Sequence, residues 1–121
     1  MKRLTKAEEE VMQGLWQFGP CTVSQLLEKM GKEKSPHSTI SSIVRILEKK
    51  GFVDHKTYGR TYEYFPIIEK KEYSKVSLSR LLTNYFEGSV NELVSFIVKE
   101  KNLSIDELNE LIDHLENKSD D

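Results

Sequence analysis

Apolar residues recur every three or four positions along most of the chain, which is the spacing of one face of an α-helix. In the first half this pattern predicts helices over residues 6–18, 23–30 and 36–50. From residue 52 to residue 66 the pattern changes to two short runs rich in β-branched and aromatic residues, one on either side of Gly59. These two runs predict a β-hairpin with a tight turn.

The second half keeps the helical spacing, in three apolar stripes within residues 78–86, 90–98 and 108–115. Three short helices bury too little of their own surface to form a good independent core. We therefore expect the stripes to pack against a second copy of the same chain. The residues expected at this interface are Leu78, Leu81, Leu82, Tyr85, Phe86, Leu93, Val94, Ile97, Leu108, Leu111, Ile112 and Leu115.

The complete pattern predicts a mainly α-helical chain with a small β-hairpin as a wing. Three short helices followed by a hairpin are the element order of a winged helix-turn-helix domain, which we place at residues 1–68. Residues 69–121 are then expected to form a three-helix dimerisation region.

Four helix starts carry one signal, a Ser or Thr followed three residues later by Glu or Gln. In this capping box the hydroxyl accepts from a backbone N–H of the first turn, and the acid or amide reaches back to the cap. The third helix lacks the box; there we expect Ser35 as N-cap and Pro36 at the first helical position. The four pairs are Thr5 with Glu8, Thr22 with Gln25, Ser89 with Glu92, and Ser104 with Glu107.

Composition limits the classes to which the chain can belong. With 37% hydrophobic and 31% charged residues it has the composition of a folded, soluble protein. The apolar runs are all shorter than a membrane span of roughly 18–20 residues, and the charged start is unlike a secretory signal. We therefore expect no membrane insertion and a cytoplasmic location. Cys21 is the only cysteine, which excludes an internal disulfide and a cluster of thiolates around a metal.

The net charge of −2 hides an asymmetry between the two halves. Residues 1–66 carry 11 Lys and Arg against 8 Asp and Glu, whereas residues 67–121 carry 7 against 12. Within residues 29–60 the excess is larger, with 8 basic residues and 3 acidic ones. A basic first half suggests contact with a polyanion, and an acidic second half suggests a different task.

The third helix offers a surface that suits the major groove of DNA. Its apolar residues fall on one arc, and the opposite arc carries hydroxyls and basic side chains, which can bond base edges or phosphates. Two basic residues flank the hairpin turn, where a wing would meet the backbone. The competing interpretation is a helix with an ordinary polar back and a solvated hairpin. The candidate DNA-binding residues are Ser38, Thr39, Ser41, Ser42, Arg45, Lys49, Lys56 and Arg60.

Two other functions compete with DNA binding. An enzyme would need its chemistry from Cys21 and the three histidines, His37, His55 and His114. No two of these histidines have the spacing of a helical metal pair, and Cys21 precedes a helix where a packed residue is expected, so we predict no enzyme, metal or cofactor. The second alternative is a winged helix that binds another protein rather than specific DNA, because a fold alone does not decide function.

Six segments of the chain match one known family, in order and at family spacing. They are Leu4-Thr5-Lys6-Ala7-Glu8-Glu9-Glu10-Val11-Met12, Leu15-Trp16, Ser38-Thr39-Ile40-Ser41-Ser42-Ile43, Leu47-Glu48-Lys49-Lys50-Gly51-Phe52-Val53, Gly59-Arg60-Thr61-Tyr62-Glu63-Tyr64-Phe65-Pro66 and Phe86-x-Gly88-Ser89. Through these segments the chain resembles the penicillinase-repressor (BlaI/MecI) family over nearly its whole length. This resemblance implies a homodimeric transcriptional repressor that binds a pseudo-palindromic operator in double-stranded DNA. Relatives that sense copper carry paired C-terminal cysteines, which this chain lacks.

The resemblance also implies an off-switch in response to cell-wall antibiotics. In family members controlled by β-lactams, the dimerisation helices are cut before a Phe, and the matching bond here is Ser95–Phe96. A membrane-bound sensor metalloprotease is the implied upstream partner. Relatives usually have Asn where this chain has Ser95. The alternative is that Phe96 is only a core or interface residue of an uncut helix.

Overall fold

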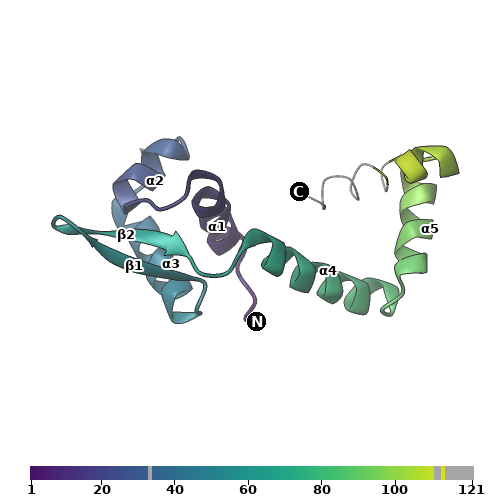
Figure 1. Ribbon diagram of the computed structural model, residues 1–121, viewed down its shortest axis with the longest axis horizontal. Helices are drawn as coiled ribbons and strands as arrows, with labels where there is room; N and C mark the ends of the chain where they lie inside the picture. The colour runs from purple at the N-terminus through teal and green to yellow at the C-terminus, as the bar shows by residue number, and fades with distance from the viewer. Residues whose placement is uncertain (33, 111–112, 114–121) are drawn as a thin grey trace. The chain divides into compact units, whose positions relative to one another are not determined.

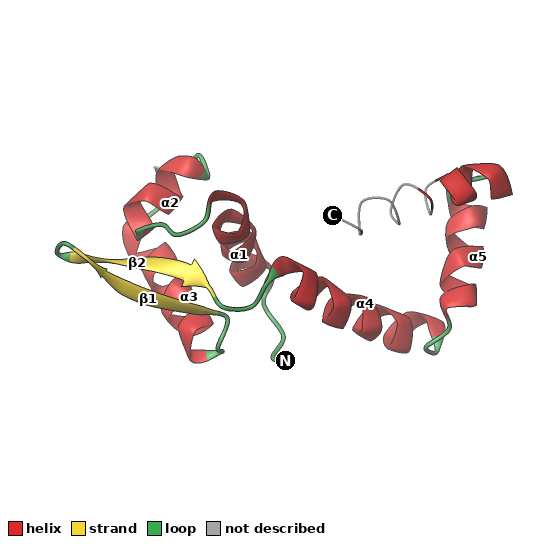
Figure 2. Ribbon diagram, in the orientation of Figure 1, coloured by secondary structure: helices red, strands yellow, loops and turns green. Residues whose placement is uncertain are grey.

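The computed structural model describes residues 1–32, 34–110 and 113. The chain divides into two compact units, Met1–Lys75 and Val76–Asp121, each described here by itself. The order of helices and strands in the first unit is that of a winged helix, as the sequence predicts (Figures 1 and 2). The elements are α1 (Lys6–Phe18), α2 (Val23–Lys29), α3 (His37–Lys49), β1 (Val53–Tyr58), β2 (Thr61–Pro66), α4 (Lys70–Phe86) and α5 (Val90–Glu100).

The first two helices begin at the predicted capping boxes. The Glu8 amide donates to the Thr5 hydroxyl at 3.2 Å, and the Thr5 amide donates to the Glu8 carboxylate at 3.0 Å. Thr22 and Gln25 make the same reciprocal pair at the start of α2. Each box satisfies backbone donors that the first turn of a helix leaves without a partner. The sequence prediction of these two helix starts is confirmed.

Helix α3 begins one residue later than expected. Pro36, not Ser35, is the N-cap residue, with an extended backbone at φ −59° and ψ 130°, and His37 is the first helical residue. The physical reason is that Pro36 already accepts from the Thr39 amide at 3.1 Å, so its carbonyl closes the first turn while its own conformation stays extended. The missing N–H of proline is harmless at this position too.

The core of the first unit is formed by side chains from α1, α2, α3 and the hairpin. Close approach of α1 and α2 explains Gly14 inside a helix: a Cβ there would lie 2.9 Å from the Met30 sulfur and 3.0 Å from a Leu26 methyl carbon. Trp16 and Ile43 are half-buried against this core. The buried apolar residues are Val11, Met12, Leu15, Cys21, Val23, Leu26, Leu27, Ile40, Val44, Leu47, Phe52, Val53, Tyr64 and Tyr73.

A Schellman motif turns the chain from α3 into β1. Gly51 has the positive φ of 82° that this motif requires, its amide donates to the Glu48 carbonyl, and the Phe52 amide donates to the Leu47 carbonyl, both at 3.0 Å. Strands β1 and β2 then pair antiparallel, from Val53 opposite Pro66 to the two ends of the hairpin loop. The motif therefore returns β1 alongside the end of α3.

The wing has a two-residue loop, Gly59-Arg60, in which only Gly59 has a positive φ, as in a type II′ turn. At the other end of the hairpin, Cys21 and Tyr64 exchange both backbone hydrogen bonds, at 3.0 and 2.8 Å. This bridge fastens the start of α2 to β2. The three helices α1, α2 and α3 and the hairpin therefore pack together as one body.

The first turn of α4 belongs to the first unit. The Tyr73 ring packs 5.7 Å from the Trp16 ring and 5.8 Å from the Phe52 ring, and its hydroxyl donates to Glu9. The Trp16 indole also donates to the Ile68 carbonyl at 2.9 Å. These contacts extend the first compact unit to Lys75, later than the boundary at residue 68 that the sequence suggests.

In the second unit, α5 begins at Ser89, whose hydroxyl accepts from the Glu92 amide at 3.1 Å. The Phe86 and Phe96 rings meet edge to face, with centroids 5.4 Å apart. A further helical turn starts at Ser104, which accepts from the Glu107 amide at 3.1 Å. The predicted interface positions Leu111, Ile112 and Leu115 lie outside the described residues.

Candidate nucleic-acid interface

Helix α3 turns its polar arc to solvent, as predicted. Its apolar arc, with Ile40, Val44 and Leu47 buried, packs on the core and fixes the rotation of the helix. One apolar residue, Ile46, interrupts the polar surface and is 43% exposed. The exposed candidates are Ser38, Thr39, Ser42, Arg45 and Lys49, with Ser41 half-buried beside them.

A surface hollow of about 330 Å³ lies between α3 and β2 and collects several of the predicted residues. Ser41 and Arg45 enter it from α3, and Arg60 enters it from the tip of the wing. Among the described residues that line it, none carries a carboxylate, so two arginines set its charge. The remaining lining residues are Val23, His37, Thr61, Tyr62 and Tyr64.

Two side-chain contacts set the surroundings of the hollow. Ser41 and His37 form a hydrogen bond of 3.2 Å between the hydroxyl and Nδ1, one turn apart on α3. Arg45 forms a side-chain hydrogen bond with the phenol of Tyr64. Burial raises the pKa of Tyr64 above its ordinary value, the nearby charge of Glu48 raises it further, and Arg45 opposes both. Tyr64 is therefore a neutral phenol that lines the hollow together with Arg45.

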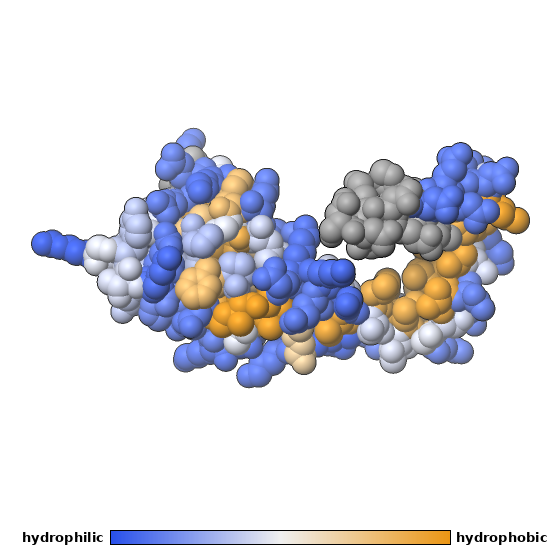
Figure 3. Space-filling view, viewed as in Figure 1, coloured by the Kyte–Doolittle hydropathy of each residue, from blue (hydrophilic) through white to orange (hydrophobic). Residues whose placement is uncertain are grey.

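The two basic residues of the wing have different surroundings. Lys56 stands opposite Glu63 across the hairpin, and its ammonium lies 3.3 Å from that carboxylate. The Lys56 side chain is 65% exposed, so solvent screens this pair and it contributes little to stability. Arg60 lies in the hairpin loop and lines the hollow instead. The space-filling view shows hydrophilic surface at the tip of the wing (Figure 3). Arg60 therefore lines the same hollow as Arg45, whereas Lys56 does not.

A cluster that sequence reasoning missed lies beside this surface. Glu48, Asp54 and His55 bring one carboxylate or imidazole atom each to within 4.8 Å of one another. A single histidine beside two acids lacks the paired spacing that marks a helical metal site in a sequence. The signal that could have revealed it is the Gly51 helix end, because a tight return of the chain brings residue 48 and residue 55 face to face.

The buried pair of Glu8 and Lys50 holds the end of α3 against the start of α1. The Lys50 ammonium contacts both carboxylate oxygens, one at 3.2 Å, and also donates to the Arg3 carbonyl at 3.0 Å. Burial pushes the pKa of Glu8 up, but the bonds from Lys50 and Thr5 outweigh it and hold that pKa below its ordinary value. Glu8 is therefore ionised at neutral pH, and its contacts with Lys50 hold the end of α3 in place.

Cys21, the residue that an enzyme would have needed, is packed away. Its side chain is 1% exposed, and its thiol donates to the Gly19 carbonyl at 3.2 Å. Burial raises the pKa of the thiol above its ordinary value. A buried thiol with a raised pKa is a poor nucleophile, which fits a packing role.

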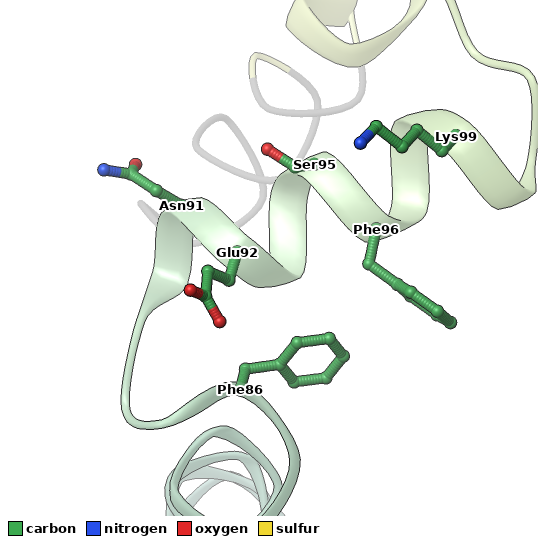
Figure 4. Close-up of a pocket in the computed structure, with 6 residues that line it drawn as sticks. All are labelled: Phe86, Asn91, Glu92, Ser95, Phe96 and Lys99. Atoms are coloured by element: carbon green, nitrogen blue, oxygen red, sulfur yellow. The ribbon is translucent and has the colours of Figure 1, made fainter.

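The bond predicted for cleavage lies inside α5, at its middle. Ser95 and Phe96 are both exposed, with Phe96 51% exposed. They line an open hollow of about 420 Å³ together with Phe86. Figure 4 shows Phe96 directed to the side where Phe86 lies and Ser95 directed away from it. The other lining residues are Asn91, Glu92 and Lys99.

Comparison with known proteins identifies the relationship. The family model described as penicillinase repressor matches residues 4–117. The chain belongs to the penicillinase repressor family. This is a family of transcriptional repressors, not of enzymes, so the family expected from the sequence motifs is confirmed.

Curated relatives match along nearly all of their length. The penicillinase repressor of Bacillus licheniformis is 28% identical over 94% of this chain and 90% of its own. The methicillin resistance regulatory protein MecI of Staphylococcus aureus (strain N315) is 30% identical over 95% of this chain and 94% of its own. Among solved structures, a MarR family protein from Bacillus stearothermophilus is similar to 84% of this chain and 73% of its own, with 20% identity and a TM-score of 0.48. Within the described part of the chain, none of the helices is both long enough and apolar enough to span a membrane.

Proposed function

We propose that this member of the penicillinase repressor family binds operator DNA as a homodimer and thereby blocks transcription. The observation that carries the proposal is the exposed polar arc of α3 beside a hollow that holds Arg45 and Arg60 and is free of carboxylates among its described lining. A helix fits the major groove of B-DNA, and cations beside it fit the phosphates. The proposed repressor would act in the cytoplasm.

The proposed roles follow from position on this surface. Ser38, Thr39 and Ser42 are short exposed donors on α3 and would meet base edges or nearby phosphates. Arg45 would bond a base edge or a phosphate at the mouth of the hollow, and its contact with Tyr64 limits how far it can move. Arg60 would meet the backbone from the wing. Lys56 and Lys49 would add charge outside the hollow.

The second unit supports a homodimer. No described residue between 76 and 110 is buried. Several large apolar side chains are instead open to solvent: Leu78 is 49%, Tyr85 75% and Val90 59% exposed. Apolar atoms are visible on the surface of α5 in Figure 3. Exposed apolar surface of this kind is typical of an interface, and a second copy of the chain is its simplest partner.

A dimer explains how short recognition helices reach useful affinity. Two copies of α3 related by a two-fold axis would read half-sites about one or more helical turns apart, each roughly 34–36 Å. Once one half-site is bound, the second binds as an intramolecular step at high effective concentration. Breaking the dimer would therefore weaken operator binding without changing any contact to DNA.

This logic makes α5 a suitable place for an off-switch by proteolysis. A protease needs an extended substrate, and α5 has no buried residue among its eleven, so local opening of this helix is inexpensive. A cut between Ser95 and Phe96 would separate Phe96 from Ser89, the cap of the helix, and from Phe86, its ring partner. The proposed protease is a membrane-bound sensor metalloprotease that responds to cell-wall antibiotics.

The DNA-binding proposal is tested with duplexes selected from a random pool and sequenced. We expect an imperfect palindrome and an affinity that falls steeply as salt rises, because bound cations release counterions from DNA. Arg45→Ala should weaken binding by about 1–3 kcal/mol and relax preference at one position of each half-site. Arg60→Ala should weaken binding to all DNA sequences to the same extent. Lys71→Ala, which removes an equal charge from an exposed site on α4, is the matched control.

Two results would reject the DNA-binding proposal. One is an affinity for DNA that does not change with salt, as expected of a winged helix that binds another protein. The other is an Arg45→Ala variant with unchanged affinity and unchanged sequence preference.

The proteolytic switch is tested separately, in induced cells. Mass spectrometry should detect a fragment that ends at Ser95, and Phe96→Ala should prevent both the cut and derepression. Val98→Ala, on the same helix and half-buried, is the control and should leave the cut in place. Derepression with an intact chain would rule out the switch and leave the DNA-binding proposal untouched.

A further inference from the structure

The base of the wing holds a cluster of donor atoms that DNA binding does not use. Glu48 lies in the last turn of α3, and Asp54 and His55 are neighbours in β1. One donor atom from each side chain lies within 4.8 Å of the other two. We propose that Glu48, Asp54 and His55 bind a divalent transition-metal cation of the Zn²⁺ type.

Contacts within and beside the cluster position each donor. The Glu48 carboxylate contacts Nδ1 of His55 directly, which turns this nitrogen toward the cluster. One oxygen of Asp54 accepts from the His55 amide at 2.8 Å, and its second oxygen remains available for a ligand bond. The His55 ring stacks on Tyr62 with centroids 4.2 Å apart, which fixes the plane of the imidazole. The ligands are therefore oriented before a cation arrives.

The backbone between the ligands is rigid for a physical reason. The Schellman motif at Gly51 uses two hydrogen bonds of 3.0 Å, and the next two residues, Phe52 and Val53, are each 1% exposed in the core. This anchored turn separates Glu48 from Asp54 and His55. A preorganised ligand set loses little conformational entropy on binding, which favours affinity.

The chemistry of the donors selects the class of cation. One imidazole and two carboxylates form a mixed nitrogen and oxygen set, which suits Zn²⁺ and its first-row neighbours better than Ca²⁺ or Mg²⁺. Zn²⁺ binds such donors at about 2.0–2.2 Å, so the three side chains would close around it and the direct Glu48 to His55 contact would open. Three protein ligands leave a fourth position for water, and Glu48 and His55 are only half-buried, so the ion would exchange with solution.

A cation here would also change the charge beside the proposed DNA surface, a consequence that rests on the proposed function. The His55 ring, which Glu48 contacts, lies 5.6 Å from the ring of Tyr64, and Tyr64 lines the hollow together with Arg45, so the cluster lies near that hollow. A bound divalent cation neutralises Glu48 and Asp54. The wing would then present a more positive surface, and Zn²⁺ should raise the affinity for DNA.

The metal site is tested first without DNA, by calorimetric titration of the full chain with Zn²⁺ in a non-chelating buffer. We expect one saturable site per chain that uses His55. Replacing His55 by Gln should weaken binding by at least about tenfold. His37→Gln and His114→Gln, which alter the other two histidines of the chain, are the matched controls and should bind as the unchanged protein does.

Asp54→Asn keeps the test valid if the loss of His55 disturbs the wing, because Asp54 is exposed and outside the core. Circular dichroism verifies that the variants fold. Absence of saturable binding would overturn the site. So would an affinity for Zn²⁺ in the His55→Gln and Asp54→Asn variants that equals the affinity of the unchanged chain. Loss of binding in His37→Gln or His114→Gln would overturn it as well, since the ligands would then lie elsewhere.

The effect on DNA is measured last, with a selected duplex and with or without Zn²⁺. We expect tighter binding with Zn²⁺ in the unchanged chain and no response in the His55→Gln variant. If Zn²⁺ binds but DNA affinity stays the same, the coupling is overturned while the metal site stands. If the chain binds no DNA at all, the proposed function fails, and the calorimetric result still decides the metal site.

Discussion

The two units of the chain begin their helices in the same way and bury their side chains very differently. Thr5 and Thr22 cap helices in the first unit, and Ser89 and Ser104 do so in the second. Yet the first unit contains all the buried apolar residues of the described chain, whereas none of residues 76–110 is buried. Local signals therefore decide where helices start, and they do not decide whether those helices are stable alone.

The physical reason lies in the small energy of a short helix. An isolated helix of about 12–15 residues is marginal in water, and most of its stability in a protein comes from the burial of an apolar face. The first unit supplies that burial within one chain. The described helices of the second unit leave apolar side chains exposed, and the proposed dimer would supply the missing burial. This contrast predicts which substitutions act on a single copy and which act through concentration.

The largest effect on one copy should come from the buried face of α3. Leu47 is fully buried, so Leu47→Ala should lower the free energy of unfolding by about 2–5 kcal/mol, through lost burial and the cavity left behind. Leu81 in α4 is 41% exposed, and Leu81→Ala should leave the monomer nearly unchanged while it weakens the dimer. Urea unfolding measures the first effect, and sedimentation at several concentrations measures the second.

The contrast between the two units would be wrong if Leu47→Ala and Leu81→Ala had the same effect on stability. A concentration-independent loss of stability from Leu81→Ala, as large as that from Leu47→Ala, would show that the second unit has its own core. A chain that sediments as a monomer at micromolar concentration would remove the proposed dimer altogether.

The next largest expected effect is a dependence of stability on pH, and it concerns only the first unit. The folded-state pKa of Glu8 lies below its ordinary value of 4.5, because the bonds from Lys50 and Thr5 outweigh the effect of burial. Stabilisation by ionised Glu8 is therefore complete above the unfolded pKa and is lost as the pH falls through the folded pKa. Glu8→Gln should cost about 1–3 kcal/mol at pH 7, since it leaves a half-buried Lys50 without its charged partner.

Urea unfolding between pH 3 and pH 7 checks this effect. The unchanged chain should lose stability on acidification below the ordinary pKa of a glutamate, and Glu8→Gln should lose less over the same range. Glu72→Gln, on the exposed surface of α4, is the control and should follow the unchanged chain. An identical acid dependence in Glu8→Gln would show that the buried pair does not stabilise α3.

A smaller effect tests where the first unit ends. Trp16 donates to the Ile68 carbonyl at 2.9 Å and packs on Tyr73, so it fastens the start of α4 to α1. Trp16→Phe keeps an aromatic ring and removes the hydrogen bond, which should cost about 0.5–1.5 kcal/mol. Hydrogen exchange should speed up in the first turn of α4. Unchanged exchange there would mean that the indole bond does not anchor the helix.

Sequence patterns predicted much of this architecture and missed what depends on distant contacts. The helical spacing and the capping boxes at Thr5 and Thr22 predicted α1 and α2, and the turn at Gly59 predicted the hairpin, because these signals act over a few residues. The inclusion of Tyr73 in the first unit escaped prediction, since its partners Trp16 and Phe52 are far away in sequence.

The candidate DNA surface shows the same limit. The polar arc of α3 follows from helical spacing, so its candidates could be chosen from sequence. The grouping of Arg45 with Arg60 around one hollow, and the pairing of Lys56 with Glu63, depend on how the wing folds back. The meeting of Glu48 with His55 depends on the turn at Gly51 in the same way. Which residues act at the DNA surface remains a prediction that binding measurements can check.

The smallest effect compares matched caps in the two units. Thr22 and Ser89 each accept from the amide three residues on, at 3.2 and 3.1 Å, so removal of either hydroxyl leaves one first-turn donor without its partner. Thr22→Ala should lower the free energy of unfolding of the first unit by about 0.5–1 kcal/mol, at any protein concentration, because α2 is part of a cooperative core.

Ser89→Ala should act differently although its hydrogen bond is the same. It should leave the urea midpoint of the first unit in place, reduce the helical signal of α5, and shift the monomer–dimer equilibrium by about 0.5 kcal/mol or less, since the capping hydrogen bond of α5 is exposed to solvent. Thr22→Ser and Ser89→Thr are the conservative controls, because both keep a hydroxyl acceptor. If Ser89→Ala lowered the stability of the first unit as Thr22→Ala does, the two units would fold as one cooperative body, and the contrast between them would be wrong.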